Sequence, residues 1–123
     1  MIDLRRRDGG PVLRIGHRGA ASLAPENTVR AMRAAVERGV DLVEFDVLDL
    51  PRGPLVLAHS DRLEEVSHGA AAGSVRARSL DELREVAPEL PTLDDALGYF
   101  ADEAPEVGPV SYTHLTLPTI LRV

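Results

Sequence analysis

The chain has 123 residues, a formal net charge of −6 at pH 7 and no cysteine. This length suits one small domain, but it is short of the ~250 residues of a complete (β/α)₈ barrel. The acidic balance argues against a nucleic-acid partner. The lack of cysteine excludes disulfides and thiolate metal sites.

Membrane insertion and secretion are not predicted. No stretch approaches the ~20 apolar residues that a membrane span needs. The arginines at 5–7 are not followed by an apolar segment, so they do not form a secretory or twin-arginine signal. We therefore expect no membrane span and a cytoplasmic protein.

The first predicted strand covers residues 12–16, a short apolar run that ends in glycine and delivers His17. A helix is then predicted to begin at Asn27 or Thr28, since either side chain can cap its first turn. Gly39 is a suitable stop, because glycine accepts the left-handed conformation at little cost. Apolar side chains recur at helical spacing in between: Val29, Met32 and Val36.

A second strand is predicted over residues 41–48, and the helix before it implies a parallel pair with the first strand. A period of two places Glu44 and Asp46 on one face. The opposite face is apolar and comprises Val43, Phe45 and Val47. In a barrel the acids would face the lumen. A third short strand, 55–58, delivers His59.

The rest of the chain is predicted to contain two helices. Residues 60–79 have the composition of a loop. Ser79, with Glu82 three residues later, forms a capping box that begins one helix. A second helix begins at Thr92 and runs to about Ala101. No fourth strand is predicted.

Residues 109–123 differ from the rest of the chain, because they contain no acidic residue and no alanine. The run resembles the translated transposon adapter that appears when a sequencing library is read past its insert. We therefore expect residues 1–108 to be a partial native domain and residues 109–123 to be a non-native tail. The alternative is a genuine, divergent C-terminus.

Two carboxylates on one strand suggest a cation site. The Cα atoms of Glu44 and Asp46 would be about 6.5–7 Å apart, so both side chains can lean onto one Ca²⁺ or Mg²⁺. An acidic pair at a solvated strand end is the alternative. Burying two acids beside Phe and Val without compensation is costly, which favours a cation.

The remaining polar side chains suit phosphoryl chemistry. His17 and His59 can act as acid and base, one taking a proton from an attacking hydroxyl and the other protonating a leaving alkoxide. Arg18 can fork onto phosphate oxygens. Glu26 is either a helix first-turn acid or a cation ligand. Because these groups follow successive strands, a (β/α)₈ barrel would gather them at one mouth.

Four ordered motifs resemble the N-terminal third of glycerophosphodiester phosphodiesterases. They are His-Arg-Gly at 17–19, Pro-Glu-Asn-Thr at 25–28, Val-Glu-Phe-Asp-Val at 43–47 with His59, and Leu-Pro-Thr-Leu-Asp-Asp-Ala-Leu at 90–97. The resemblance implies a (β/α)₈ TIM barrel, here truncated after about three strands. It also implies metal-assisted hydrolysis of small glycerophosphodiesters to glycerol 3-phosphate and an alcohol.

The resemblance assigns roles by position. His17 and His59 correspond to the acid–base pair, and Arg18 to a phosphate contact. Two metal ligands correspond to Glu44 and Asp46. Glu26 falls near the cation.

Two departures from the family pattern matter. Ser60 intervenes between His59 and Asp61, where the family commonly has an Asp directly after the histidine. In the family, the next strand carries a further metal-binding Glu and a nearby Lys. In this chain the tail, residues 109–123, stands in place of that strand. We therefore expect the chain to be inactive and poorly folded, with the apolar face of its first helix exposed to water.

Two other functions are compatible with the same residues. A phospholipase or sphingomyelinase-D-like enzyme of the same superfamily would share the histidines and acids, and the missing secretion signal argues only weakly against it. A non-catalytic phosphate-ligand binding module is the other alternative. Both histidines argue against such a module, because a binder needs no acid–base pair.

Overall fold

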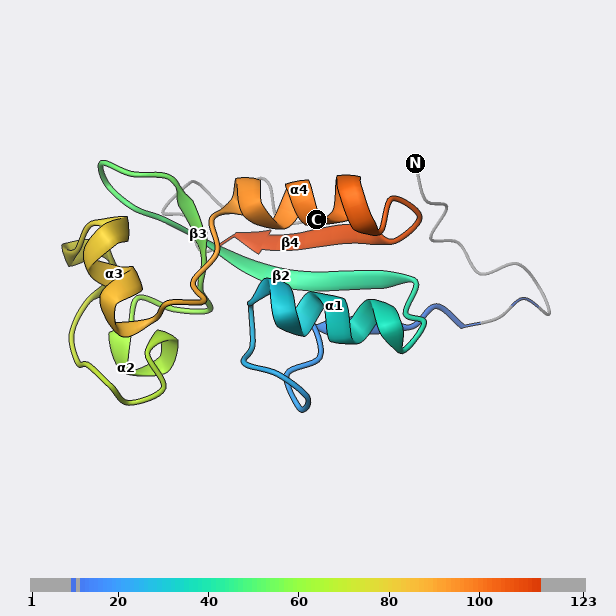
Figure 1. Ribbon diagram of the computed structural model, residues 1–123, viewed down its shortest axis with the longest axis horizontal. Coiled ribbons are helices and arrows are strands. Elements are labelled where there is room, and N and C mark those ends of the chain that lie inside the picture. The colour runs from blue at the N-terminus through green and yellow to red at the C-terminus, as the bar shows by residue number, and fades with distance from the viewer. Residues whose placement is uncertain (1–9, 11, 114–123) are drawn as a thin grey trace.

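The structure is a computed structural model that describes residue 10 and residues 12–113 (Figure 1). The arginines at 5–7 and the tail beyond residue 113 lie outside the described residues. The strands are β1 (Ile15–His17), β2 (Leu42–Asp49), β3 (Leu55–Leu57) and β4 (Gly108–Thr113). The helices are α1 (Val29–Glu37), α2 (Leu63–Val66), the 3₁₀ helix η1 (Val75–Ala77), α3 (Leu80–Val86) and α4 (Leu93–Glu103).

Strand β2 is the centre of the sheet. It pairs in parallel with β1, His17 lying opposite Glu44, and it pairs in parallel with β4 over six residues. It forms an antiparallel hairpin with β3. Val43 is paired with both β1 and β4, and Val47 with both β3 and β4. Since a strand has two edges, β1 and β3 share one edge of β2, and β4 occupies the other.

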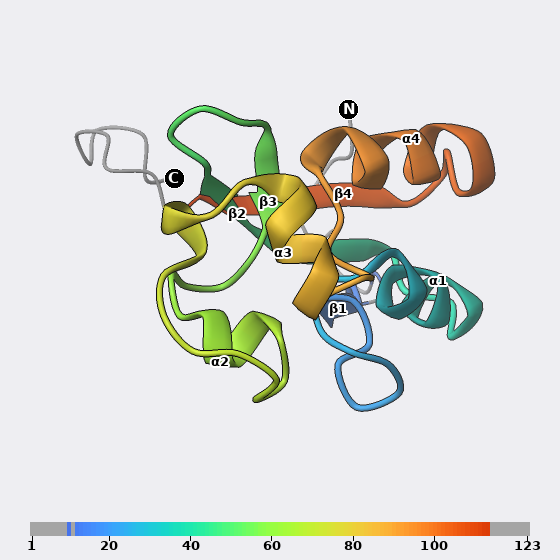
Figure 2. The same cartoon turned by 60° about the vertical axis from the view of Figure 1, so that its left-hand side comes forward.

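The alternation predicted for β2 is confirmed. Val43, Phe45 and Val47 are almost fully buried and pack against α1 and α4, which lie on the same side of the sheet (Figure 2). The ring of Phe45 stacks on Phe100 of α4, with centroids 6.3 Å apart. We call β1, α1, β2, α4 and β4 the barrel layer. Its cluster is completed by residues of both helices, of β3 and of the turn before β4: Met32, Ala35, Leu57, Ala96, Tyr99, Phe100, Ala104 and Val107.

Residues 50–91, between β2 and α4, form a second unit that we call the excursion. It holds β3, α2, η1 and α3, and Figure 1 shows α2 and α3 to one side of the barrel layer. It has an apolar cluster of its own, made with the end of β2: Leu48, Leu50, Val56, Ala58, Leu63, Val75, Leu83, Ala87 and Leu90.

The local signals for helices α1, α3 and α4 are confirmed. Thr28 caps α1 by accepting a hydrogen bond from the N–H of Ala31, and Gly39 follows its end with a φ of 76°. Ser79 and Thr92 each form a capping box at the start of α3 and α4. None of the helices in residues 12–113 has the length and apolar content that crossing a membrane requires.

Three expectations need correction. Residues 60–79 are not only loop, because Leu63 and Val75 are fully buried and hold α2 and η1 in place. The apolar face of α1 is not exposed: Met32 is fully buried, and Val29 and Val36 pack against the barrel-layer cluster.

The third correction concerns the sheet, which gains a fourth strand where it was expected to end. Pairing of β4 with β2 uses backbone N–H and C=O groups, and every residue except proline supplies both. The side-chain pattern of residues 108–113 therefore could not exclude the strand, and the pairing says nothing about the origin of the segment.

Candidate active site

The turn after β1 brings the first site residues onto α1. Arg18 and Gly19 both have positive φ, 53° and 80°. A Cβ added to Gly19 would lie 2.6 Å from the carbonyl carbon of Ala31, so only glycine lets the turn approach the helix so closely. The N–H of Gly19 donates to the carbonyl of Glu44, which ties the turn to β2.

Arg18 connects three of the predicted acids. Its Nη1 lies 2.9 Å from Glu26 Oε2 and its Nε 3.1 Å from Asp46 Oδ2, while its backbone N–H donates to Glu44 Oε2 at 3.2 Å. The Nε–H is not aimed along the contact to Asp46, so that contact is electrostatic rather than a hydrogen bond. Burial lowers the pKa of Arg18, but the hydrogen bond and charge of Glu26, with the charges of Asp46 and Glu65, outweigh it and raise that pKa.

Asn27 holds the most buried acid. It sits in the left-handed region with a φ of 56°, a conformation that asparagine tolerates better than most residues. Its Nδ2 donates to Asp46 Oδ2 at 3.2 Å, and its Oδ1 accepts from the backbone N–H of Asp46 at 3.1 Å. From the sequence, Asn27 was expected only as a candidate helix cap and as part of the motif at 25–28. Its place between Glu26 and Thr28 was the available signal for a role in the site.

The two histidines are held differently. The His17 side chain is 73% exposed, and its Nε2 lies 3.8 Å from Glu44 Oε2. His59 Nδ1 lies 2.8 Å from Glu65 Oε1, and the hydroxyl of Ser60 donates to Glu65 Oε2 at 2.6 Å. Sequence reasoning missed Glu65, because it lies in the stretch predicted to be loop and no periodicity marks it.

Glu65 is ionised in this setting. The hydrogen bond from Ser60 lowers its pKa, burial opposes this, and the hydrogen bond with His59 adds to the lowering, so the pKa lies below its usual value. The nearby Arg18 charge acts in the same direction.

Asp61, whose relation to His59 the sequence left open, binds elsewhere. Its carboxylate accepts from Ser74 Oγ at 2.6 Å and from the backbone N–H of Arg76 at 2.8 Å. Burial would raise the pKa of Asp61, but these hydrogen bonds hold it below its ordinary value. Asp61 thus closes the loop between α2 and η1.

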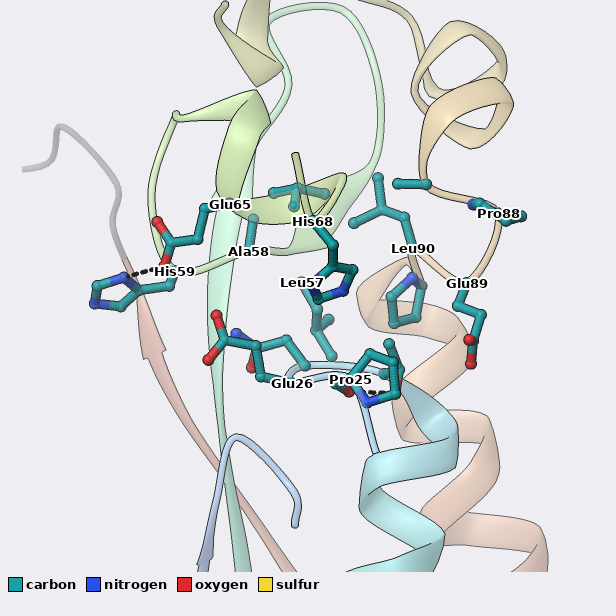
Figure 3. A pocket seen from close by; sticks show the side chains of 15 residues that line it. Pro25, Glu26, Leu57, Ala58, His59, Glu65, His68, Pro88, Glu89 and Leu90 are labelled. Atoms are coloured by element: carbon teal, nitrogen blue, oxygen red, sulfur yellow. Dashed lines mark hydrogen bonds and ion pairs between the residues drawn. The ribbon is translucent and has the colours of Figure 1, made fainter. Parts of the chain in front are cut away.

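A cavity of about 80 Å³ adjoins these groups (Figure 3). His59 and Glu65 lie together at one side of it, and the Glu26 carboxylate points toward them. The opposite wall is formed by Pro88, Glu89 and Leu90. His59 therefore shares a cavity with Glu26, and Glu26 is joined through Arg18 to the acids of β2.

The donor set has the right chemistry for a hard divalent cation, because Glu26, Glu44 and Asp46 offer only carboxylate oxygens. Within residues 12–113, however, no group of three His, Cys, Asp or Glu side chains is arranged as ready ligands. The Arg18 guanidinium instead contacts both Glu26 and Asp46 and balances their charge.

Comparisons with known proteins bear on the family and the fold of the chain. The model of the glycerophosphoryl diester phosphodiesterase family matches residues 17–121. The chain is 35% identical over 72 residues to the glycerophosphodiester phosphodiesterase of Caldanaerobacter subterraneus subsp. tengcongensis. These 72 residues are 58% of this chain and 29% of that protein.

Two solved structures are similar in fold. The glycerophosphodiester phosphodiesterase of Thermotoga maritima has a TM-score of 0.72 at 26% identity, covering 84% of this chain and 44% of that one. An Oleispira antarctica phosphodiesterase in complex with the product sn-glycerol-3-phosphate has a TM-score of 0.68 at 27% identity, covering 80% and 43%. The chain thus spans less than half the length of each of these relatives. It belongs to the glycerophosphoryl diester phosphodiesterase family, and its strands and helices form part of that family's TIM barrel.

Proposed function

We propose that residues 1–108 are the N-terminal part of an enzyme that hydrolyses glycerophosphodiesters to glycerol 3-phosphate and an alcohol. The observation that carries this proposal is the contact of Arg18 with the carboxylates of Glu26 and Asp46, next to Glu44 and His17. A guanidinium that can bind phosphate oxygens, flanked by histidines that can transfer protons, suits the hydrolysis of a phosphate ester.

In this proposal the residues of the chain divide the work. Arg18 hydrogen-bonds the phosphate oxygens and offsets the charge that grows on them in the transition state. His17 and His59 act as acid and base: one takes the proton from the attacking hydroxyl, and the other protonates the leaving alkoxide.

Glu44, Asp46 and Glu26 would hold a divalent cation, Ca²⁺ or Mg²⁺. Such a cation would supply further positive charge beside the phosphate.

The test uses a complete enzyme that contains this segment. It is assayed on a choline-type glycerophosphodiester and on a lysophospholipid, with and without Ca²⁺ or Mg²⁺. Cation-dependent release of glycerol 3-phosphate is the expected result. Turnover of the lysophospholipid alone would indicate a phospholipase or sphingomyelinase-D-like enzyme. Binding without turnover would indicate a phosphate-ligand module.

We also infer that the 123-residue chain is inactive by itself. Strand β4 carries no acidic or basic residue, so it brings no further ligand to the carboxylates of β2. Turnover by the isolated chain in Ca²⁺ or Mg²⁺ would overturn this inference.

Residues 109–123 are, in our proposal, a non-native tail. Their composition supports it, although the family match itself extends to residue 121. Reading the genomic DNA beyond the codon for Gly108 tests it. An open reading frame that continues with a different sequence is expected, and one that encodes residues 109–123 would refute the tail.

A further inference from the structure

We propose that Glu65 is a positioning residue for His59, fixing its imidazole with the proton on Nδ1 and the basic nitrogen at Nε2. The geometry carries this inference, since Glu65 Oε1 lies 2.8 Å from His59 Nδ1. The role of His59 in proton transfer rests on the proposed function. The assignment of its proton to Nδ1 is independent of that function.

The direction of the hydrogen bond follows from the chemistry of the partners. An ionised carboxylate can only accept hydrogen bonds, so the proton between the two groups must belong to Nδ1. The pKa of Glu65 is held low by Ser60, His59 and the charge of Arg18, which keeps the carboxylate ionised at neutral pH. In the neutral ring, Nε2 is then the nitrogen that can take up a proton.

Ser60 makes Glu65 a rigid acceptor rather than a mobile one. The backbone N–H of Arg62 donates to Ser60 Oγ at 3.3 Å, and Ser60 in turn donates to Glu65 Oε2 at 2.6 Å. Both carboxylate oxygens are thereby engaged, one by a hydroxyl and one by the imidazole.

This arrangement explains how the chain accommodates serine directly after the histidine. A hydroxyl at position 60 can donate to Glu65, whereas a carboxylate there would face Glu65 as a second negative charge. Asp61, the nearest downstream acid, is already committed to Ser74 and Arg76. The positioning acid therefore comes from α2, six residues after the histidine.

The experiment measures the tautomer of His59 directly. The chain is labelled with ¹⁵N-histidine, and long-range ¹⁵N–¹H correlation spectra are recorded at about pH 8, above the ordinary titration range of histidine. A His59→Gln variant assigns the resonance. We expect the unsubstituted chain to show His59 with only Nδ1 protonated.

Variants then separate positioning from a general structural role. Glu65→Ala should lose the single-tautomer pattern and give a mixture. Glu65→Gln should restore most of it, because the amide oxygen can still accept from Nδ1. Ser60→Ala should give an intermediate mixture, and the neighbouring Glu64→Ala on α2 should leave the spectrum of His59 unchanged.

Each outcome decides the proposal. A His59 spectrum that is the same with and without the Glu65 side chain would overturn it. So would a spectrum in which all histidines of the unsubstituted chain average as in an unfolded peptide. No turnover is measured, so failure here is distinct from failure of the proposed phosphodiesterase reaction.

Discussion

The barrel layer and the excursion bury separate apolar clusters, and each supplies a different part of the candidate site. The barrel layer carries the charged groups: Arg18, Glu26, Glu44 and Asp46. The excursion carries His59 together with the side chains that orient it. The site is therefore assembled from two units that fold around different cores.

Strand β2 shows how the two units meet. One face of the strand carries Glu44 and Asp46 and then, with the same period of two, Leu48 and the following Leu50. This face is polar beside Arg18 and becomes apolar where the excursion packs on it. The site lies at this change, where His59 of the excursion meets the charged groups of the barrel layer.

The largest expected effect is on catalysis. In the complete enzyme, His17→Ala or His59→Ala should lower kcat by about 10²–10⁴-fold, the usual contribution of a general acid or base. Steady-state kinetics on a glycerophosphodiester measures the change, with Asp102→Asn on the exposed side of α4 as a control. Near-normal turnover in both histidine variants would mean that another pair transfers the protons.

The next largest effects are losses of stability, and they distinguish the apolar cluster of the barrel layer from that of the excursion. Phe45→Ala should cost about 3–5 kcal/mol of the free energy of unfolding, and Leu83→Ala about 2–5 kcal/mol, because both side chains are almost fully buried. Amide exchange should show different patterns. Phe45→Ala should reduce amide protection in both units, and Leu83→Ala should reduce it mainly in the excursion. Equal loss of protection across both units in Leu83→Ala would show that they open as one.

The features that sequence predicted are those with local causes. The alternation of β2 and the capping box at Ser79 depend on residues a few positions apart, and the structure confirms them. The stop at Gly39 is of the same kind, because it depends on a single backbone conformation. Parallel pairing of β1 with β2 followed from the helix between them.

The features that sequence missed depend on distant contacts. Helices α2 and η1 are too short to show a period, and they exist because Leu63 and Val75 fill the excursion core. Glu65 reaches His59 only once α2 is in place. Neither Asn27 nor Thr28 could be chosen as the cap from their residue types, whereas in the structure Asp46 engages the first and α1 the second.

A smaller effect should distinguish the two acids of β2. Asp46→Asn should cost about 1–3 kcal/mol of stability, because this buried carboxylate pairs with Arg18 and Asn27. Glu44→Gln, at a more exposed position, should cost less than about 1 kcal/mol. In the complete enzyme both variants should raise the Ca²⁺ or Mg²⁺ concentration needed for activity. Unchanged metal dependence in both would remove them from the cation site.

Acid should destabilise the excursion. The pKa values of Asp61 and Glu65 lie below their ordinary values, so the folded chain binds fewer protons there than the unfolded chain. Their contribution to stability is complete above the ordinary carboxyl pKa, about 4, and is lost as pH falls through the lower folded values. Amide exchange at falling pH measures this. Asp61→Asn should flatten the response of the excursion, and the exposed Asp81→Asn should not.

The smallest expected effects come from the two capping boxes, one in each unit. Ser79→Ala and Thr92→Ala should each cost about 1 kcal/mol, since each removes the acceptor for a free N–H of the first helical turn. Ser79→Ala should affect the excursion alone.

The cap at Thr92 is different, because its partner Asp95 also binds Arg84 of α3 at 2.9 Å. Hydrogen bonds from the backbone and side chain of Thr92 lower the pKa of Asp95, against the effect of its burial, and the charge of Arg84 adds to them. Thr92→Ala should therefore reduce amide protection in α3 as well as in α4. If protection in α3 is unchanged by Thr92→Ala, the Arg84–Asp95 pair does not couple the two units.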